Sequence, residues 1–179
     1  MGLQVSGDLH SRRWPLVEYA VGVFRGQTVI YSPAEHYHAA AGRVMVHPLR
    51  GLTLGADWYG SFSAPARSEK RRGEAEGGYE RGPLRLRAEQ IWARDGTLQR
   101  RGGYALGSWR LSPHWEPLAR ADWLTTNIHE ANTTSIAYLA GVNFYLGKHV
   151  KIGSNAGLQH DQGPKGFSSL FLAQTMFSF

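Results

Sequence analysis

The sequence contains no cysteine and no long uninterrupted apolar run. The absence of cysteine excludes disulfide scaffolds, cysteine-ligated zinc sites and thiol nucleophiles. A helical membrane span needs about 20 consecutive, mostly apolar residues, and the mean hydropathy of −0.37 agrees with the lack of such a run. Because the composition of the 179 residues shows no break, we expect a single domain over residues 1–179.

Glycine and aromatic residues, by contrast, are abundant. The chain has 22 glycines and 12% aromatic residues, a mixture that suits short strands and tight turns. Apolar and polar residues alternate with a period of two through segments of about ten residues, the length of a tilted strand that crosses a bilayer. The expected strands are 2–10, 15–25, 38–47, 52–63, 73–81, 84–94, 102–111, 115–125, 134–146, 150–160 and 167–179.

The connections between these segments alternate between short and long. The stretches "HPLRG" and "ERGP" are short, whereas "SAPARSEKRRG" and "RDGTLQRRG" are longer and polar. Tight turns on one rim and longer loops on the other are typical of up-and-down membrane barrels. The sequence therefore predicts an all-β fold, an antiparallel up-and-down transmembrane β-barrel of about 10 to 12 strands.

The location of the charges indicates which face of the sheet meets lipid. In segment 84–94, Leu84 and Leu86 alternate with Arg85 and Arg87. A soluble sheet also alternates, so alternation alone does not distinguish water from lipid outside. Two observations favour a barrel with lipid on its outer face and water in its lumen. Ionised groups lie on the face opposite the apolar residues, and aromatic residues lie near the strand ends. The alternative for the aromatic residues is an ordinary core.

Six stretches follow one another in the order of the hairpins of a known family. They are "PLVEYAVGVFRG", "AGRVMVHPLRGLTLGADWYG", "EAEGGYERGPLRLRAEQIWARDG", "YALGSWRLSPHWEPLARADW", "AGVNFYLGKHVKIGSNAG" and the closing "LAQTMFSF" with its terminal Phe179. Over nearly its whole length, the chain resembles the C-terminal part of the phosphate-selective porin family, the porin O and P type. The resemblance implies a channel in the outer membrane of a Gram-negative bacterium, for passive diffusion of small, preferentially anionic solutes such as phosphate. It further implies homotrimers. Because the sequence has no nucleophile signature, we expect no enzymatic activity and no cofactor.

Two sets of charged residues are candidates for the functional site. Those expected to line the pore are Arg43, Arg85, Arg87, Arg110, Arg120, Lys151, Asp57 and Glu89. Those expected in loops, where they would attract anions, are Arg67, Lys70, Arg71, Arg72, Arg100 and Arg101. As alternatives, opposite charges in the lumen pair across strands and hold the wall in shape, and the loop residues are merely solvated or contact anionic lipopolysaccharide.

Other functions stay open at this point. A narrow or plugged barrel would be a structural or adhesive surface protein, and a barrel hydrolase acting on lipid would use serine, histidine and acidic residues near the loop rim. Candidates for the hydrolase are His129, Glu130, His160, Asp161 and Ser168. His36 and His38 lie two residues apart, but no third ligand has a recognisable spacing, so we expect no metal site.

The expected partners are outer-membrane lipid, lipopolysaccharide and small anions. Nucleic acid is disfavoured, because no basic stripe is interleaved with exposed stacking aromatic residues. The start "MGLQVSGDLHSRRW" lacks the features of a secretory signal, and bacterial barrels normally have an even number of strands. We therefore expect the C-terminal part of a longer porin, whose first and last strands here would be poorly paired.

Overall fold

A computed structural model describes residues 2–11, 14–27, 36–62, 69–147, 149–162 and 166–177. The strands are β1 (Gly2–Ser11), β2 (Trp14–Gln27), β3 (His36–Leu49), β4 (Leu52–Phe62), β5 (Lys70–Arg81), β6 (Leu84–Asp95), β7 (Leu98–Trp109), β8 (Trp115–Thr125), β9 (Thr134–Leu146), β10 (Val150–Asp161) and β11 (Gly166–Phe177). They form one sheet in chain order, and each strand pairs antiparallel with the next. The all-β, up-and-down prediction is confirmed. Within the described ranges, no helix is long and apolar enough to span a membrane.

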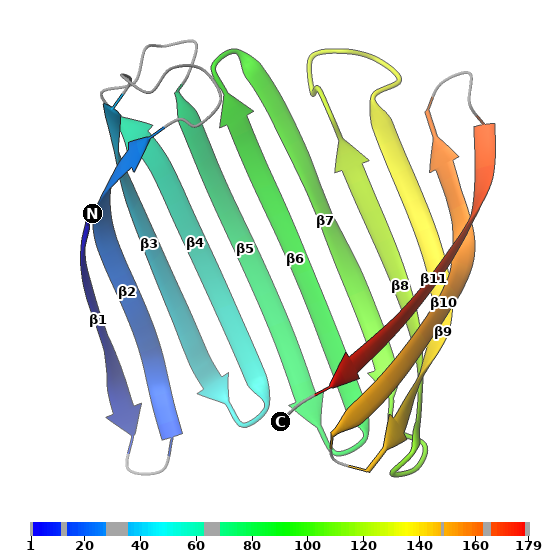
Figure 1. Cartoon of the computed structure of the whole chain (residues 1–179). Coiled ribbons are helices and arrows are strands. Elements are labelled where there is room, and N and C mark those ends of the chain that lie inside the picture. Colours follow the sequence, from blue (N-terminus) through cyan, green and yellow to red (C-terminus); the bar gives the residue numbers. More distant parts are fainter. Residues whose placement is uncertain are drawn as a thin grey trace.

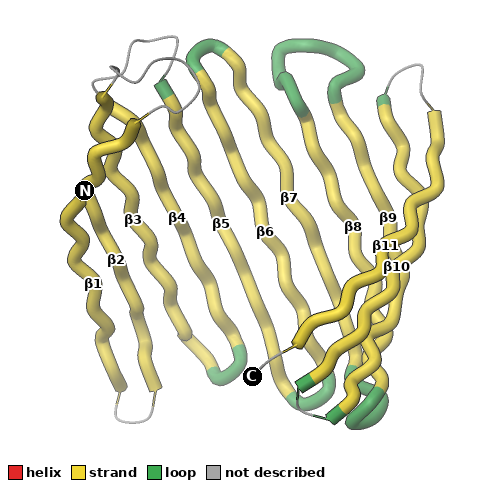
Figure 2. Tube along the Cα trace, in the orientation of Figure 1, coloured by secondary structure: helices red, strands yellow, loops and turns green. Residues whose placement is uncertain are grey.

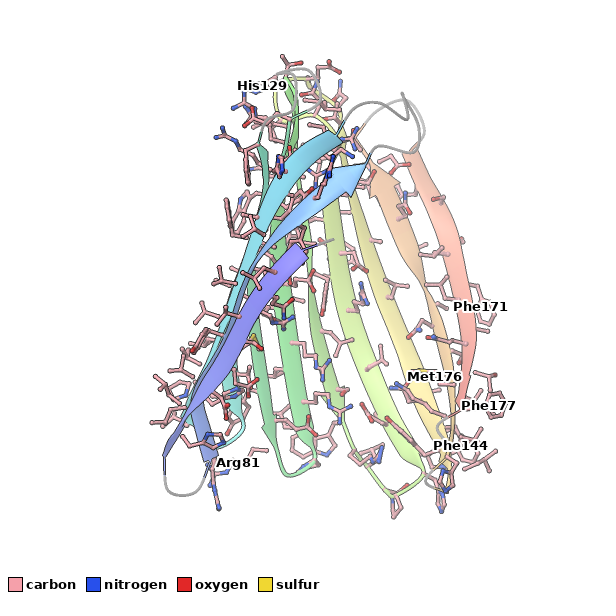
Figure 3. All side chains as sticks on the ribbon, turned by 60° about the vertical axis from the view of Figure 1, so that its left-hand side comes forward. Arg81, His129, Phe144, Phe171, Met176 and Phe177 are labelled. Carbon is pink, nitrogen blue, oxygen red and sulfur yellow. The ribbon has the colours of Figure 1, made fainter. Side chains whose placement is uncertain are left out.

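The sheet is strongly curved (Figures 1 and 2). Short turns join β3 to β4 and β5 to β6 at one end, the tight-turn rim, and at the other end a tight turn joins β6 to β7 and a longer connection joins β8 to β9. Seen from the side of β1, it forms a trough, with β1 to β3 on one flank and β9 to β11 on the other (Figure 3). Among the described residues, β1 pairs only with β2 and β11 only with β10. The outer strands are therefore edges of the sheet, as expected from the sequence.

Two strands begin earlier than the alternation indicated. The sequence placed their starts at residues 73 and 102, whereas β5 begins at Lys70 and β7 at Leu98. Asp95 pairs directly with Leu98, and Gly96 between them has a φ of 59°. Two-residue hairpin turns require this left-handed conformation, which glycine adopts without strain. The prediction of a long loop around residues 94–101 is wrong, because a tight turn joins β6 to β7.

The two faces of the sheet differ in chemistry, and the polar face is the concave one. Phe171 and Phe177 of β11 point away from the trough in Figure 3. On β9, Tyr138 is 62% exposed and lies on this convex face, whereas Leu139 on the opposite face is 6% exposed. Such exposed apolar side chains occur along the convex face of most strands, in the inverse of the pattern of a soluble protein. The predicted separation of apolar and charged residues onto opposite faces is confirmed, and contact of the convex face with lipid stays a prediction.

A bulge interrupts the ladder between β3 and β4. The register shifts between Val46 and Leu49, so that His47 and Pro48 have no ladder partners on β4. Proline lacks the amide hydrogen that a central ladder needs, and bulges accommodate it. The bulge directs the His47 side chain toward the concave face, where it contacts residues of two neighbouring strands.

Candidate functional site: the charged concave wall

The concave face carries the acidic side chains of the described strands. The cross-strand register places on this face Asp8, Glu18, Asp57, Glu74, Glu76, Glu80, Glu89, Asp95, Glu116, Asp122 and Asp161. It also places there the basic residues Arg43, Lys70, Arg72, Arg85, Arg87, Arg100, Arg120 and Lys151. The concave wall is thus densely charged and mixed in sign, with acidic side chains in the majority.

The convex face is very different. The charged side chains that the described strands place on it are all arginines, namely Arg25, Arg71, Arg81, Arg94 and Arg101. Each lies near an end of its strand, so the middle of the convex face has no ionised arginine, lysine or carboxylate among the described residues. An uncharged band bounded by charged rims is the pattern that a bilayer requires on the lipid side of a barrel.

An acidic group occupies the wall formed by β3 to β6. Arg43 Nη2 lies 2.6 Å from Glu76 Oε1, and Arg43 Nε lies 3.7 Å from Asp57 Oδ1. Oxygens of Asp57, Glu74 and Glu76 lie within 4.8 Å of one another, an arrangement of hard ligands that suits a cation. Glu74 and Glu89 have no basic partner at ion-pairing distance within the described ranges. This part of the wall therefore favours positive charge in the lumen.

A second group is centred on Glu116 near the tight-turn rim. This carboxylate accepts hydrogen bonds from Tyr145 Oη at 2.6 Å and Ser108 Oγ at 2.7 Å. Its oxygens also lie 3.3 Å from Arg110 Nη1 and 3.6 Å from Arg85 Nη1. The carboxylate is buried and fully paired, because only contacts of this kind offset the cost of removing a charge from water. It therefore braces β6 to β9.

Besides Lys70 at the rim of β5, two basic residues on the concave face are not neutralised in this way. Arg87 and Lys151 have no carboxylate at ion-pairing distance among the described residues, and the Lys151 ammonium lies 5.8 Å from the Tyr145 ring. Arg120, by contrast, makes a bidentate contact with Asp122 at 2.6 and 2.8 Å and lies over the Tyr104 ring. Arg87 and Lys151 are thus the basic groups of the inner wall that are best placed to attract anions.

The structure brings the predicted pore-lining residues onto one surface. Arg43, Arg85, Arg87, Arg120, Lys151, Asp57 and Glu89 all lie on the concave face. Arg110 lies one residue beyond β7, although its guanidinium reaches Glu116. Several of these residues pair across strands, as the alternative interpretation of the lumen charges expected.

The residues predicted in loops need correction. Lys70, Arg71 and Arg72 lie in β5, and Arg100 and Arg101 lie in β7, because both strands extend toward the rim. Alternation along a strand then separates them: Lys70, Arg72 and Arg100 are on the concave face, while Arg71 and Arg101 are on the convex face. Arg72 and Arg100 share Asp95, at 2.6 and 3.8 Å. Arg67 lies outside the described residues.

The sequence did not reveal a hydrogen-bonded chain of three side chains at the bulge. His47 Nδ1 lies 3.1 Å from Thr53 Oγ1, and His47 Nε2 lies 3.2 Å from Glu18 Oε1. The "HP" pair within an alternating segment, which is unusual in a central strand, would have been the signal for the bulge. We assign this hydrogen-bonded group of side chains a structural role, because it joins β2, β3 and β4 where the ladder is interrupted.

The hydrolase candidates do not form a catalytic group. His160 pairs in register with Phe167 and lies on the convex face, whereas Ser168 pairs with Gln159 and lies on the concave face. His129 belongs to the connection between β8 and β9, at the upper rim in Figure 3. The side chain of His36, one of the two histidines considered as metal ligands, lies outside the described part of the structure.

Comparison with known proteins supports the fold. No protein-family model matches the sequence, and no curated protein matches it. Among solved structures, the chain is similar to the outer-membrane expressed OmpT of Vibrio cholerae, with a TM-score of 0.53 and 10% sequence identity. The match covers 88% of this chain and 62% of that protein, so this chain spans less than two thirds of its length. The architecture is porin-like, and at this identity the likeness concerns the fold alone.

Proposed function

We propose that this chain forms the wall of a water-filled channel in a Gram-negative outer membrane, through which small polar solutes diffuse passively. The observation that carries the proposal is the inverted distribution of side chains. A convex surface on which the described residues place no ionised group between the rims suits lipid, and a concave surface covered with ion pairs suits water. The similarity in fold to an outer-membrane protein supports the same environment. In this proposal the chain acts as a channel wall and not as an enzyme.

We further propose a modest preference for anions, phosphate included. The resemblance to phosphate-selective porins supports it, as do Arg87 and Lys151, whose charges face the lumen without acidic partners among the described residues. Glu74, Glu89 and the overall majority of acidic side chains on the concave face oppose this preference, so we expect it to be weak. Because a channel concentrates the ions that its fixed charges attract, selectivity reflects the difference between these two sets.

The reversal potential of the chain in a planar lipid bilayer, under a salt gradient, tests both parts of the proposal. We expect ion conductance with a reversal potential on the anion-selective side. Replacing Arg87 and Lys151 by glutamine should shift the potential toward cations, whereas replacing Glu74 and Glu89 by glutamine should shift it toward anions.

The possible outcomes separate the two parts. Correctly folded protein that inserts without conducting would contradict the channel and favour the structural or adhesive barrel. Conductance that is unaffected by loss of Arg87 and Lys151 would contradict only the anion preference. The trimers expected from the resemblance stay a prediction, which cross-linking in membranes tests.

A further inference from the structure

Three arginines form a compact group on the convex face at the rim where β6 turns into β7. Arg71 of β5 lies directly opposite Arg94 of β6. Arg94 in turn lies opposite Gln99, which places it diagonal to Arg101 of β7. Direct and diagonal neighbours on one face of a sheet lie within reach of long side chains. We call Arg71, Arg94 and Arg101 the outer-rim arginine cluster.

The cluster has little compensating charge. Arg71 pairs with Glu69 at 2.6 Å, and its side chain is 61% exposed. Arg94 donates a hydrogen bond from Nε to the Gly96 carbonyl oxygen at 2.8 Å. In the described part of the chain, neither Arg94 nor Arg101 has a carboxylate at ion-pairing distance. Glu69 is thus the one carboxylate beside these three cations in the described part of the chain, and it pairs with Arg71 alone. Like charges directly opposite each other destabilise a sheet, and an anion between them would relieve the repulsion.

The position of the cluster identifies the kind of anion. Trp92 lies directly opposite Arg101, two residues before Arg94 on the same strand, and its side chain is 49% exposed on the convex face. A tryptophan followed by arginines toward the rim is the order of groups found where hydrocarbon meets lipid headgroups. Guanidinium groups bind phosphate through paired hydrogen bonds. The ligand should therefore combine an acyl chain beside Trp92 with phosphate at the height of the arginines.

We propose that the outer-rim arginine cluster is a binding site for a phosphorylated membrane lipid, held against the outside of the wall. The inference rests on the proposed membrane location, and it is independent of the channel's selectivity. It assigns Arg71 and Arg101 to lipid contact rather than to the attraction of solutes into the lumen.

The test uses two matched triple variants of the whole chain. The cluster variant is Arg71→Gln, Arg94→Gln and Arg101→Gln. The control variant is Lys70→Gln, Arg72→Gln and Arg100→Gln, which removes the same charge at the same rim from the concave face. Each protein is inserted into phosphatidylcholine vesicles, and circular dichroism checks its β-structure. The detergent-extracted proteins are then titrated with lipid A, and the bound lipid is counted by native mass spectrometry.

We expect the wild type and the control variant to bind lipid A equally, and the cluster variant to bind it about fivefold more weakly for each arginine lost. Equal binding by all three proteins, or equal loss in both variants, would overturn the inference. Displacement of lipid A by inorganic phosphate at matched phosphate concentration would overturn the assignment to a lipid. Failure of the wild type to insert into vesicles would instead contradict the proposed function.

Discussion

The convex and concave faces of the sheet are built from adjacent residues of the same strands, yet they obey opposite rules. On β9, Ala140 faces outward and is exposed, and Ala137 faces inward beside Asp122 of β8. In the proposed membrane, each outward position would have only lipid to contact, whereas each inward position would have water and a cross-strand partner. The comparison shows that strand geometry directs successive side chains to opposite faces, and that the environment on each face decides which side chains are tolerated there.

The largest effect should come from placing a charge on the wrong face. Ala140→Arg should weaken folding into phosphatidylcholine vesicles by about 2 to 4 kcal/mol, because its guanidinium would enter hydrocarbon near the middle of a strand. Ala137→Arg is the matched control, since the same side chain would enter the lumen beside Asp122. Urea titrations of folding in vesicles measure the difference. Equal costs at the two positions would contradict lipid on the convex face.

A smaller effect should separate buried from exposed charges within the concave face. Glu116→Ala should destabilise the fold by about 2 kcal/mol, because Arg85, Arg110 and Tyr145 would lose their shared acceptor. Glu80→Ala removes a carboxylate that is 57% exposed and pairs with Arg85 at 2.9 Å, so it should cost less than about 1 kcal/mol. The same titrations test this ranking, and a reversed order would show that Glu116 does not brace the wall.

The smallest effect concerns the two faces of the rim. In the proposed channel, replacing Lys70 and Arg72 by glutamine should lower the proposed anion preference, because both side chains lie on the concave face. Replacing Arg71 and Arg94 should leave it unchanged at about 0.1 M salt, where charges are screened over about 10 Å. The reversal potentials of the two double variants in a planar bilayer measure both effects. Equal effects of the two pairs would show that all basic residues of the rim attract anions alike. Whether a basic side chain lies on the concave or the convex face would then have no consequence for permeation.

Much of this fold could be predicted from alternation alone. The strand count and the identity of the apolar face both follow from a period of two. The tight turn at Gly96 was predicted as a loop, although the Asp95–Gly96 pair is a common hairpin signal. Extending β5 and β7 by a few residues then decided the face of each rim arginine.

The pairing of charges could not be predicted, because it depends on the register between strands. Arg43 lies opposite Asp57, yet its shortest contact is with Glu76 of the next strand. Glu116 gathers partners from outside its own strand, including Tyr145. Gln90 is a polar residue on the convex face, where Trp123 Nε1 donates a hydrogen bond to its Oε1 at 3.1 Å. None of these contacts follows from the order of residues along one segment.

The exposed apolar side chains of the convex face also bear on how the chain would reach the membrane proposed for it. Leu3, Val21, Trp58 and Phe171 are each more than half exposed on the folded sheet, at 72%, 58%, 54% and 71%. In water, surfaces of this kind associate with one another, and an unpaired sheet edge adds backbone groups that recruit further strands. The freshly made polypeptide should therefore need a holding chaperone during transit, and its aggregation in dilute buffer should accelerate steeply with protein concentration.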